Sequence, residues 1–130
     1  MPIVWPDGIP GAAELTEWYG GYPGFHDANA TIQLFEDGTA LLKISGHKMT
    51  DRVDEKGFFI LEKHFVAKFF FNELVSLSLS DFLPGHAILF QLDIVKSGDV
   101  FEVQFESSYG FCGSIHARKL SVRFEPLTSA

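Results

Sequence analysis

The sequence predicts a mainly β, antiparallel fold, either a two-sheet sandwich or a partly open barrel, with one short N-terminal helix. Apolar and polar residues alternate with a period of two in most segments after residue 30. Short turns connect these segments, whereas parallel strands need crossovers of about a dozen residues or more. The length of 130 residues is enough for one domain with its own core. We therefore expect a single β-rich domain over residues 1–130, with a short helix and an aromatic loop at 12–28 and strands within 30–125.

The helix is expected between Ala12 and Trp18, because Leu15 and Trp18 lie three residues apart and share a helical face. The Gly20–Gly21 pair ends it. The segment that continues to Asp27 mixes aromatic residues with turn formers, which predicts an ordered loop and not a linker. Its aromatic side chains either present a contact surface to a partner or cover the core. They are Trp18, Tyr19, Tyr22 and Phe25.

Alternation of side chains predicts the strands that follow. Leu77 and Leu79, for example, alternate with serines, so one face of that strand is wet. The expected strands cover residues 30–34, 40–44, 58–61, 64–71, 75–79, 88–94, 100–106 and 114–125. The charged segment 46–57 is expected to be a solvated loop that contributes nothing to the core. Phenylalanine-rich inner faces suit a filled core and favour a sandwich over a closed barrel.

Charge and composition narrow the classes of partner. Ten Lys and Arg residues against seventeen Asp and Glu residues leave a net charge of −7, which disfavours binding to nucleic acid and favours a basic protein. The first residues lack the basic and apolar regions of a secretory signal, and no apolar stretch reaches the roughly 20 residues of a membrane span. The only cysteine, Cys112, has no partner for an internal disulfide. We expect a cytoplasmic protein without membrane contact, either a monomer or a homodimer.

A metal site is the first chemical alternative. His26 and Asp27 are adjacent and offer two ligands, which His47 or His116 would complete in three dimensions. The histidines show no close spacing such as His-x-His, so a structural role fits better. In that role Asp27 pins the turn and His26 bonds to a carbonyl group. We therefore expect no metal and no cofactor, and keep as the alternative function a metal-dependent or small-ligand-binding enzyme centred on His26 and Asp27.

Two further patterns bear on catalysis. Cys112 and His116 lie four residues apart, which in a strand is about 13 Å and too far for direct contact. Glu102, Gln104 and Glu106 share one strand face and formally offer paired carboxylates. Such an acidic row more commonly keeps a strand soluble. We expect no catalytic residue and a function without chemistry of its own.

The segment from Gly20 to Ala28 resembles the motif of a family of small bacterial domains known as immunity protein 50. Members begin with a short helix, continue with an aromatic-Gly-x-x-Pro-Ser-Phe-His-Asp-Ala-type motif and end in a run of strands. The matching residues here are Trp18 or Tyr19, Pro23, Phe25, His26, Asp27 and Ala28. Gly24 stands in place of the usual serine, and Asn29-Ala30 stand in place of an acidic-aliphatic pair.

The resemblance implies a cytosolic protein that binds and neutralises a cognate toxin. An acidic inhibitor is attracted to a basic toxin, in agreement with the net charge. The candidate binding residues are Trp18, Tyr22, Phe25, His26, Asp27, Glu102, Gln104 and Glu106, with Asp51, Asp54 and Glu55 as further acidic surface positions. A third hypothesis is a structural domain that associates with itself through an exposed strand edge.

Overall fold

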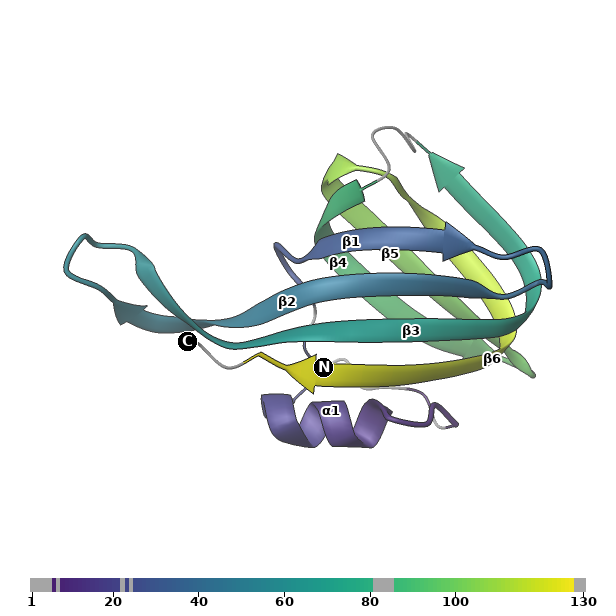
Figure 1. Ribbon diagram of the computed structural model, residues 1–130, viewed down its shortest axis with the longest axis horizontal. Coiled ribbons are helices and arrows are strands. Elements are labelled where there is room, and N and C mark those ends of the chain that lie inside the picture. Colours follow the sequence, from purple (N-terminus) through teal and green to yellow (C-terminus); the bar gives the residue numbers. More distant parts are fainter. Residues whose placement is uncertain (1–5, 7, 22, 24, 81–85, 128–130) are drawn as a thin grey trace.

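The computed structural model describes residues 6, 8–21, 23, 25–80 and 86–127, and within them it contains one helix and six long strands (Figure 1). In chain order these are α1 (Ala12–Tyr19), β1 (Asn29–Leu34), β2 (Ala40–Val53), β3 (Phe59–Ser80), β4 (His86–Ser97), β5 (Val100–Gly110) and β6 (Cys112–Pro126). The prediction of a mainly β, antiparallel fold with one short N-terminal helix is confirmed. No helix in the described ranges is long and apolar enough to cross a membrane.

The six strands form one sheet that closes on itself in the order β1-β2-β3-β6-β5-β4. Every neighbouring pair is antiparallel. The seam is short, since β1 and β4 pair only from Asn29↔Ile88 to Thr31↔His86. The ladder between β3 and β6, by contrast, runs from Phe65↔Pro126 to Ser80↔Cys112. The sheet is therefore a barrel with a narrow closing contact, and the preference for a sandwich over a closed barrel is wrong.

Three of the expected strands, at 58–61, 64–71 and 75–79, are parts of one continuous strand, β3. The chain does not reverse direction between them. Instead the chain bends within one strand. Lys63 and Glu73 adopt positive φ values of 51° and 56°. The register with β6 also shifts between Leu74 and Ser76. A single left-handed residue or bulge turns a strand without ending it, and alternation alone does not distinguish such a bend from a turn.

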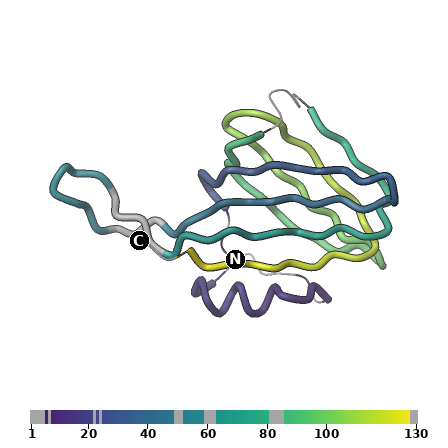
Figure 2. Tube along the Cα trace, viewed as in Figure 1, coloured from purple at the N-terminus to yellow at the C-terminus, as the bar shows by residue number. Residues whose placement is uncertain are grey.

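The expected loop at 46–57 is wrong over most of its length, because β2 continues to Val53 and pairs with the start of β3. The two strands form a hairpin arm, residues 46–64, that projects from the barrel (Figures 1 and 2). Asp54 closes its turn by accepting hydrogen bonds from the backbone N–H groups of Lys56 and Phe58. The segment 46–57 is rich in charged residues, but polarity does not prevent ladder hydrogen bonds. Within the described residues, β1 pairs with β2 only as far as Ser45 and β6 pairs with β3 only from Phe65 onward, so the outer edges of the arm have no ladder partner.

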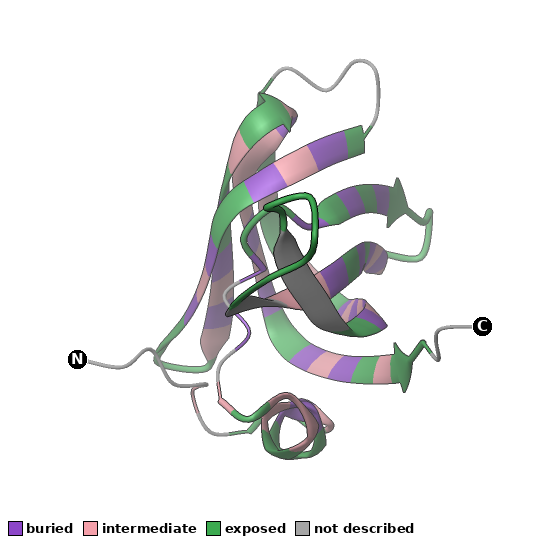
Figure 3. Ribbon diagram, turned by 90° about the vertical axis from the view of Figure 1, so that its left-hand side faces the viewer, coloured by how far each residue is buried: buried purple, intermediate pink, exposed green. Residues whose placement is uncertain are grey.

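Apolar side chains fill the barrel, and the alternation of buried and exposed residues along each strand is visible in Figure 3. Phenylalanine dominates this core, with Phe65, Phe69, Phe71, Phe101, Phe105 and Phe111 all buried. Helix α1 packs beside β6 through Ala12 and Leu15. Lys63 Nζ donates to Trp18 O at 2.6 Å and Lys48 Nζ to Tyr19 O at 3.2 Å. These lysines place positive charge at the C-terminal end of the helix, where it is favourable.

Candidate functional site

The aromatic residues of the motif pack against the core. Phe25 is 2 % exposed and makes edge contacts with Phe65 and Phe69, at centroid distances of 6.1 and 5.6 Å. Trp18 is half-buried and stacks edge-on against Phe65 at 5.8 Å, while Tyr19 contacts the same ring at 5.9 Å. Tyr22 lies outside the described residues. Of the two interpretations of this loop, the described contacts of Trp18 and Phe25 favour a lid over the core.

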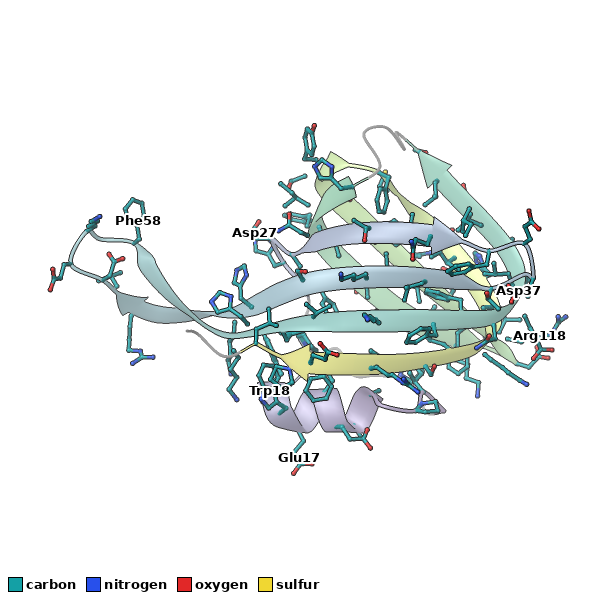
Figure 4. All side chains as sticks on the ribbon, in the orientation of Figure 1. Glu17, Trp18, Asp27, Asp37, Phe58 and Arg118 are labelled. Atoms are coloured by element: carbon teal, nitrogen blue, oxygen red, sulfur yellow. The ribbon has the colours of Figure 1, made fainter. Side chains whose placement is uncertain are left out.

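His26 and Asp27 remain exposed beside this lid, at the end of the barrel from which the arm projects (Figure 4). The Asp27 N–H donates to Leu89 O at 2.8 Å, and Leu89 N–H donates to Ala28 O at 2.8 Å, so β4 holds the loop. His26 Nδ1 lies 3.0 Å from Phe90 O. A carbonyl oxygen only accepts, so Nδ1 carries the proton. The opposite ring nitrogen, Nε2, lies 3.5 Å from Asp27 Oδ2.

Two more histidines lie at the base of the arm. The ring centroids of His47 and His64 are 5.7 Å apart. Burial lowers the pKa of His47, and the charge of His64 lowers it further, while Asp27 acts in the opposite direction and His26 in the same direction. The motif loop and the arm therefore form one electrostatic cluster, which we call the histidine cluster: His26, Asp27, His47 and His64.

The cluster does not have the arrangement of a metal centre. Among the described residues, no group of three or more His, Cys, Asp and Glu side chains is placed to hold a metal ion. Of the ligands that the sequence offered, His47 lies near enough to His26 and Asp27 for their charges to act on it. His116 does not join them, because it is bonded within β3, β5 and β6.

The lowered pKa of His47 predicts that acid destabilises the fold. Near pH 6.5, the ordinary value for histidine, the unfolded chain binds more protons at this position than the folded chain does, so stability falls as pH drops through that value towards the lower folded pKa. We expect the urea midpoint to fall between about pH 7.5 and 5.5, and the fall to be smaller in His47→Gln. His86→Gln, an exposed histidine on β4, is the control. A His47→Gln profile that overlays the wild type contradicts this prediction.

The acidic row that the sequence placed on β5 faces outward, as expected from alternation. Its register sets Glu102 opposite Val95, Gln104 opposite Asp93 and Glu106 opposite Gln91. The Gln104 side-chain amide donates to Glu102, and Gln91 Nε2 donates to Asp93 Oδ2 at 2.6 Å. We call this surface of β4 and β5 the acidic face: Gln91, Asp93, Glu102, Gln104 and Glu106. Beside it lies a hollow of about 600 Å³ that Asp93 and Glu106 line together with polar side chains of β6.

Two of the further acidic positions on the arm, Asp54 and Glu55, do not form part of this face. Asp54 is engaged in the hairpin turn, and Glu55 is exposed next to it. The side chain of Asp51 lies outside the described residues. The arm therefore presents its carboxylates separately from β5.

Sequence reasoning missed a hydrogen-bonded row that crosses three strands. Ser76 on β3 is in register with His116 on β6, and His116 is in register with Glu102 on β5. Ser76 Oγ lies 3.1 Å from His116 Nδ1, and His116 Nε2 lies 2.6 Å from Glu102 Oε2. When Nε2 donates to the carboxylate, Nδ1 is left to accept from the serine hydroxyl. The serines of β3 gave no signal for this contact, because it depends on the strand order.

The row has the order of a serine, a base and an orienting acid, which is the arrangement used in nucleophilic catalysis. Such a relay also needs a substrate pocket with donors for an oxyanion. None of its three side chains lines the adjacent hollow, and Ser76 is exposed. We conclude that His116 orients the Glu102 carboxylate and that the hydrogen-bonded row links β3, β6 and β5.

The chain was also compared with known proteins. No protein-family model, no curated protein and no solved structure matches it. Its function must therefore be argued from its own residues.

Proposed function

We propose that this protein is a non-enzymatic binding domain that occludes the surface of a basic protein, as an immunity protein neutralises a bacterial toxin. The observation that carries the proposal is the acidic face. Asp93 and Glu106 line its hollow, and no Lys or Arg side chain is present among the lining residues. A partner's cationic side chain entering this hollow would meet two carboxylates and no repelling charge.

The side chains of this surface are held in place before a partner arrives. Gln91 bonds to Asp93, Gln104 bonds to Glu102, and His116 supports Glu102 from β6. A preorganised surface loses less side-chain entropy on binding. Charge-assisted hydrogen bonds from Arg or Lys to these carboxylates would supply specificity. The net charge of −7 adds a long-range attraction that accelerates the encounter with a basic partner.

The motif that resembles immunity protein 50 has a supporting role in this proposal. Trp18 and Phe25 contact Phe65 and so fasten the helix and the loop to the barrel. His26 and Asp27 are exposed members of the motif and are accessible for contact with a partner. We infer a cytoplasmic protein that acts as a monomer or homodimer, with its single cysteine, Cys112, reduced.

The test is neutralisation by matched variants. Basic toxin candidates encoded beside the gene are co-expressed with this protein, and growth and association rate are measured. We expect protection by the wild type, and an association rate about tenfold lower at low salt for the Asp93→Asn/Glu106→Gln double variant. The control is Glu14→Gln/Glu17→Gln, which removes the same charge from helix α1.

The control distinguishes an effect of the acidic face on the association rate from an effect of the net charge alone. If both double variants lose the same amount of association rate, the acidic face is not the contact. If the Asp93→Asn/Glu106→Gln variant protects and binds like the wild type, the proposed surface is wrong.

A further inference from the structure

A row of three cations crosses the opposite part of the barrel wall. Lys43 on β2 is in register with Lys68 on β3, and Lys68 is in register with Arg123 on β6. Their strand neighbours Leu42, Ala67 and Val122 are buried in the core. Because successive side chains of a strand point to opposite faces, all three cations point outward. We call this set the basic row: Lys43, Lys68 and Arg123.

The basic row destabilises the fold when no anion is bound to it. Like charges directly opposite each other on neighbouring strands destabilise a sheet. Within the described residues, none of the three cations forms an ion pair, whereas Lys119 pairs with Glu73 at 3.3 Å and Arg118 with Asp99 at 3.7 Å. The guanidinium group of Arg123 lies over the ring of Phe70, 5.9 Å from its centroid. None of the carboxylates that the structure describes therefore compensates these three cations with an ion pair.

The two carboxylates that the structure places near the row, Asp37 and Glu125, form no ion pair with it. Asp37 lines the hollow next to Arg123 and keeps its negative charge, but its carboxylate accepts hydrogen bonds from the N–H and hydroxyl groups of Thr39 and forms no ion pair with the row. Glu125 lies two residues beyond Arg123 on β6, in register with Val66 and not with a cation. The row therefore keeps its positive charge at the surface.

A hollow of about 450 Å³ adjoins the Arg123 end of the row. Two aromatic rings, Phe35 and Phe70, supply an apolar wall, and Phe35 is 49 % exposed. Thr39, Asn72 and Ser121 add hydrogen-bonding groups to the same lining, and Asp37 adds one carboxylate, which faces the aromatic body and not the row in the arrangement proposed below. The volume lies within the range of about 300–1,000 Å³ that is typical of small-molecule sites.

We propose that the basic row and this hollow bind a small organic phosphate that carries two or three phosphate groups on an apolar or aromatic body. Neighbouring strands are about 4.8 Å apart, so the row spans roughly 10 Å, which matches a short chain of phosphates better than a single anion. Lys68 stands at the centre and reaches the middle of that chain. The aromatic body occupies the hollow against Phe35 and Phe70. This site is separate from the acidic face and does not depend on the proposed function.

A small ligand fits the charge of the molecule better than a nucleic acid does. A long polyanion would extend beyond the row and be repelled by a surface with a net charge of −7. A small phosphate is confined to the row and its hollow. The chemistry of the row thus selects a compact anion.

The test uses isothermal titration calorimetry on the untagged full chain at constant ionic strength, with inorganic tripolyphosphate and adenosine triphosphate as probes. We expect both to bind one site, with adenosine triphosphate several-fold tighter because of its aromatic body. Lys68→Gln should weaken both by about tenfold. Lys119→Gln removes the same charge from a paired lysine and should stay within about twofold of the wild type.

The melting temperature of the free protein is the second readout, and it distinguishes a loss of binding from a loss of folding. Because Lys68→Gln relieves repulsion within the row, it should raise the Tm of the free protein by about 1–4 °C. A lowered Tm would overturn the argument that the row is uncompensated.

The remaining outcomes also decide the proposal. No heat from either probe, equal weakening by Lys68→Gln and Lys119→Gln, or binding of an oligonucleotide alone would each overturn it. Equal affinity for the two probes would overturn the placement of an aromatic body in the hollow.

Discussion

Replacing Phe65 by alanine is expected to lower the free energy of unfolding by about 3–5 kcal/mol, because the ring is fully buried and its loss leaves a cavity. Phe65 is 1 % exposed and is contacted by the rings of Trp18, Tyr19 and Phe25. It is thus the residue on which both the helix and the motif loop rest. Gly46 makes room for it, since a Cβ atom there would lie 2.8 Å from Phe65 Cζ.

The measurement is urea unfolding followed by far-UV circular dichroism and by tryptophan fluorescence, which Trp18 makes sensitive to the lid. The control is Phe58→Ala, at an arm position that is 67 % exposed. We expect the control to change the free energy of unfolding by less than about 1 kcal/mol. A Phe65→Ala protein as stable as Phe58→Ala would show that Phe65 does not anchor the lid.

Periodicity predicted the strands well wherever one face is buried. The segments around Leu42, Leu92, Val103 and Val122 alternate in the sequence, and these residues are buried in the structure. Closure of the barrel was not predictable in the same way, because it depends on three residue pairs between β1 and β4 that carry no distinctive pattern. Within the arm, the sequence predicts the strand at 58–61, whereas it indicates a loop for the strand residues up to Val53 because their charged residues show no hydrophobic alternation.

The candidate sites are of two kinds: those set by neighbouring residues in the sequence, which were predicted, and those set by strand order, which were not. The adjacency of His26 and Asp27, and the shared face of Glu102 and Glu106, follow from local sequence and are present in the structure. The row Ser76–His116–Glu102 and the basic row are assembled by register across strands far apart in the sequence. Each member is an ordinary outward position of its own strand. A sequence without strand order cannot place them side by side.

Replacing Gly113 by alanine is expected to destabilise the fold by about 3 kcal/mol or more, which is the range of mutations that combine backbone strain with a steric clash. Gly113 has a φ of +153°. A Cβ atom at this position would lie 1.8 Å from the carbonyl oxygen of Ser78, a distance that requires the backbone to move. Only glycine lets β6 approach β3 this closely.

Gly21→Ala is the matched control, because Gly21 has a φ of +143° and open space within 4 Å of an added Cβ atom. It should retain the conformational strain and lack the clash, with a loss of about 1–3 kcal/mol. The difference between the two variants in urea unfolding isolates the close approach of β6 to β3.

Gly113 also pairs with Phe105 on β5 and lines the hollow of the acidic face. If the proposed function is correct, a Gly113→Ala protein that still folds at low temperature should bind its basic partner more weakly, because the strands that carry Glu106 and Cys112 are displaced. Equal stability of the two alanine variants would mean that β3 and β6 separate at Gly113 without cost.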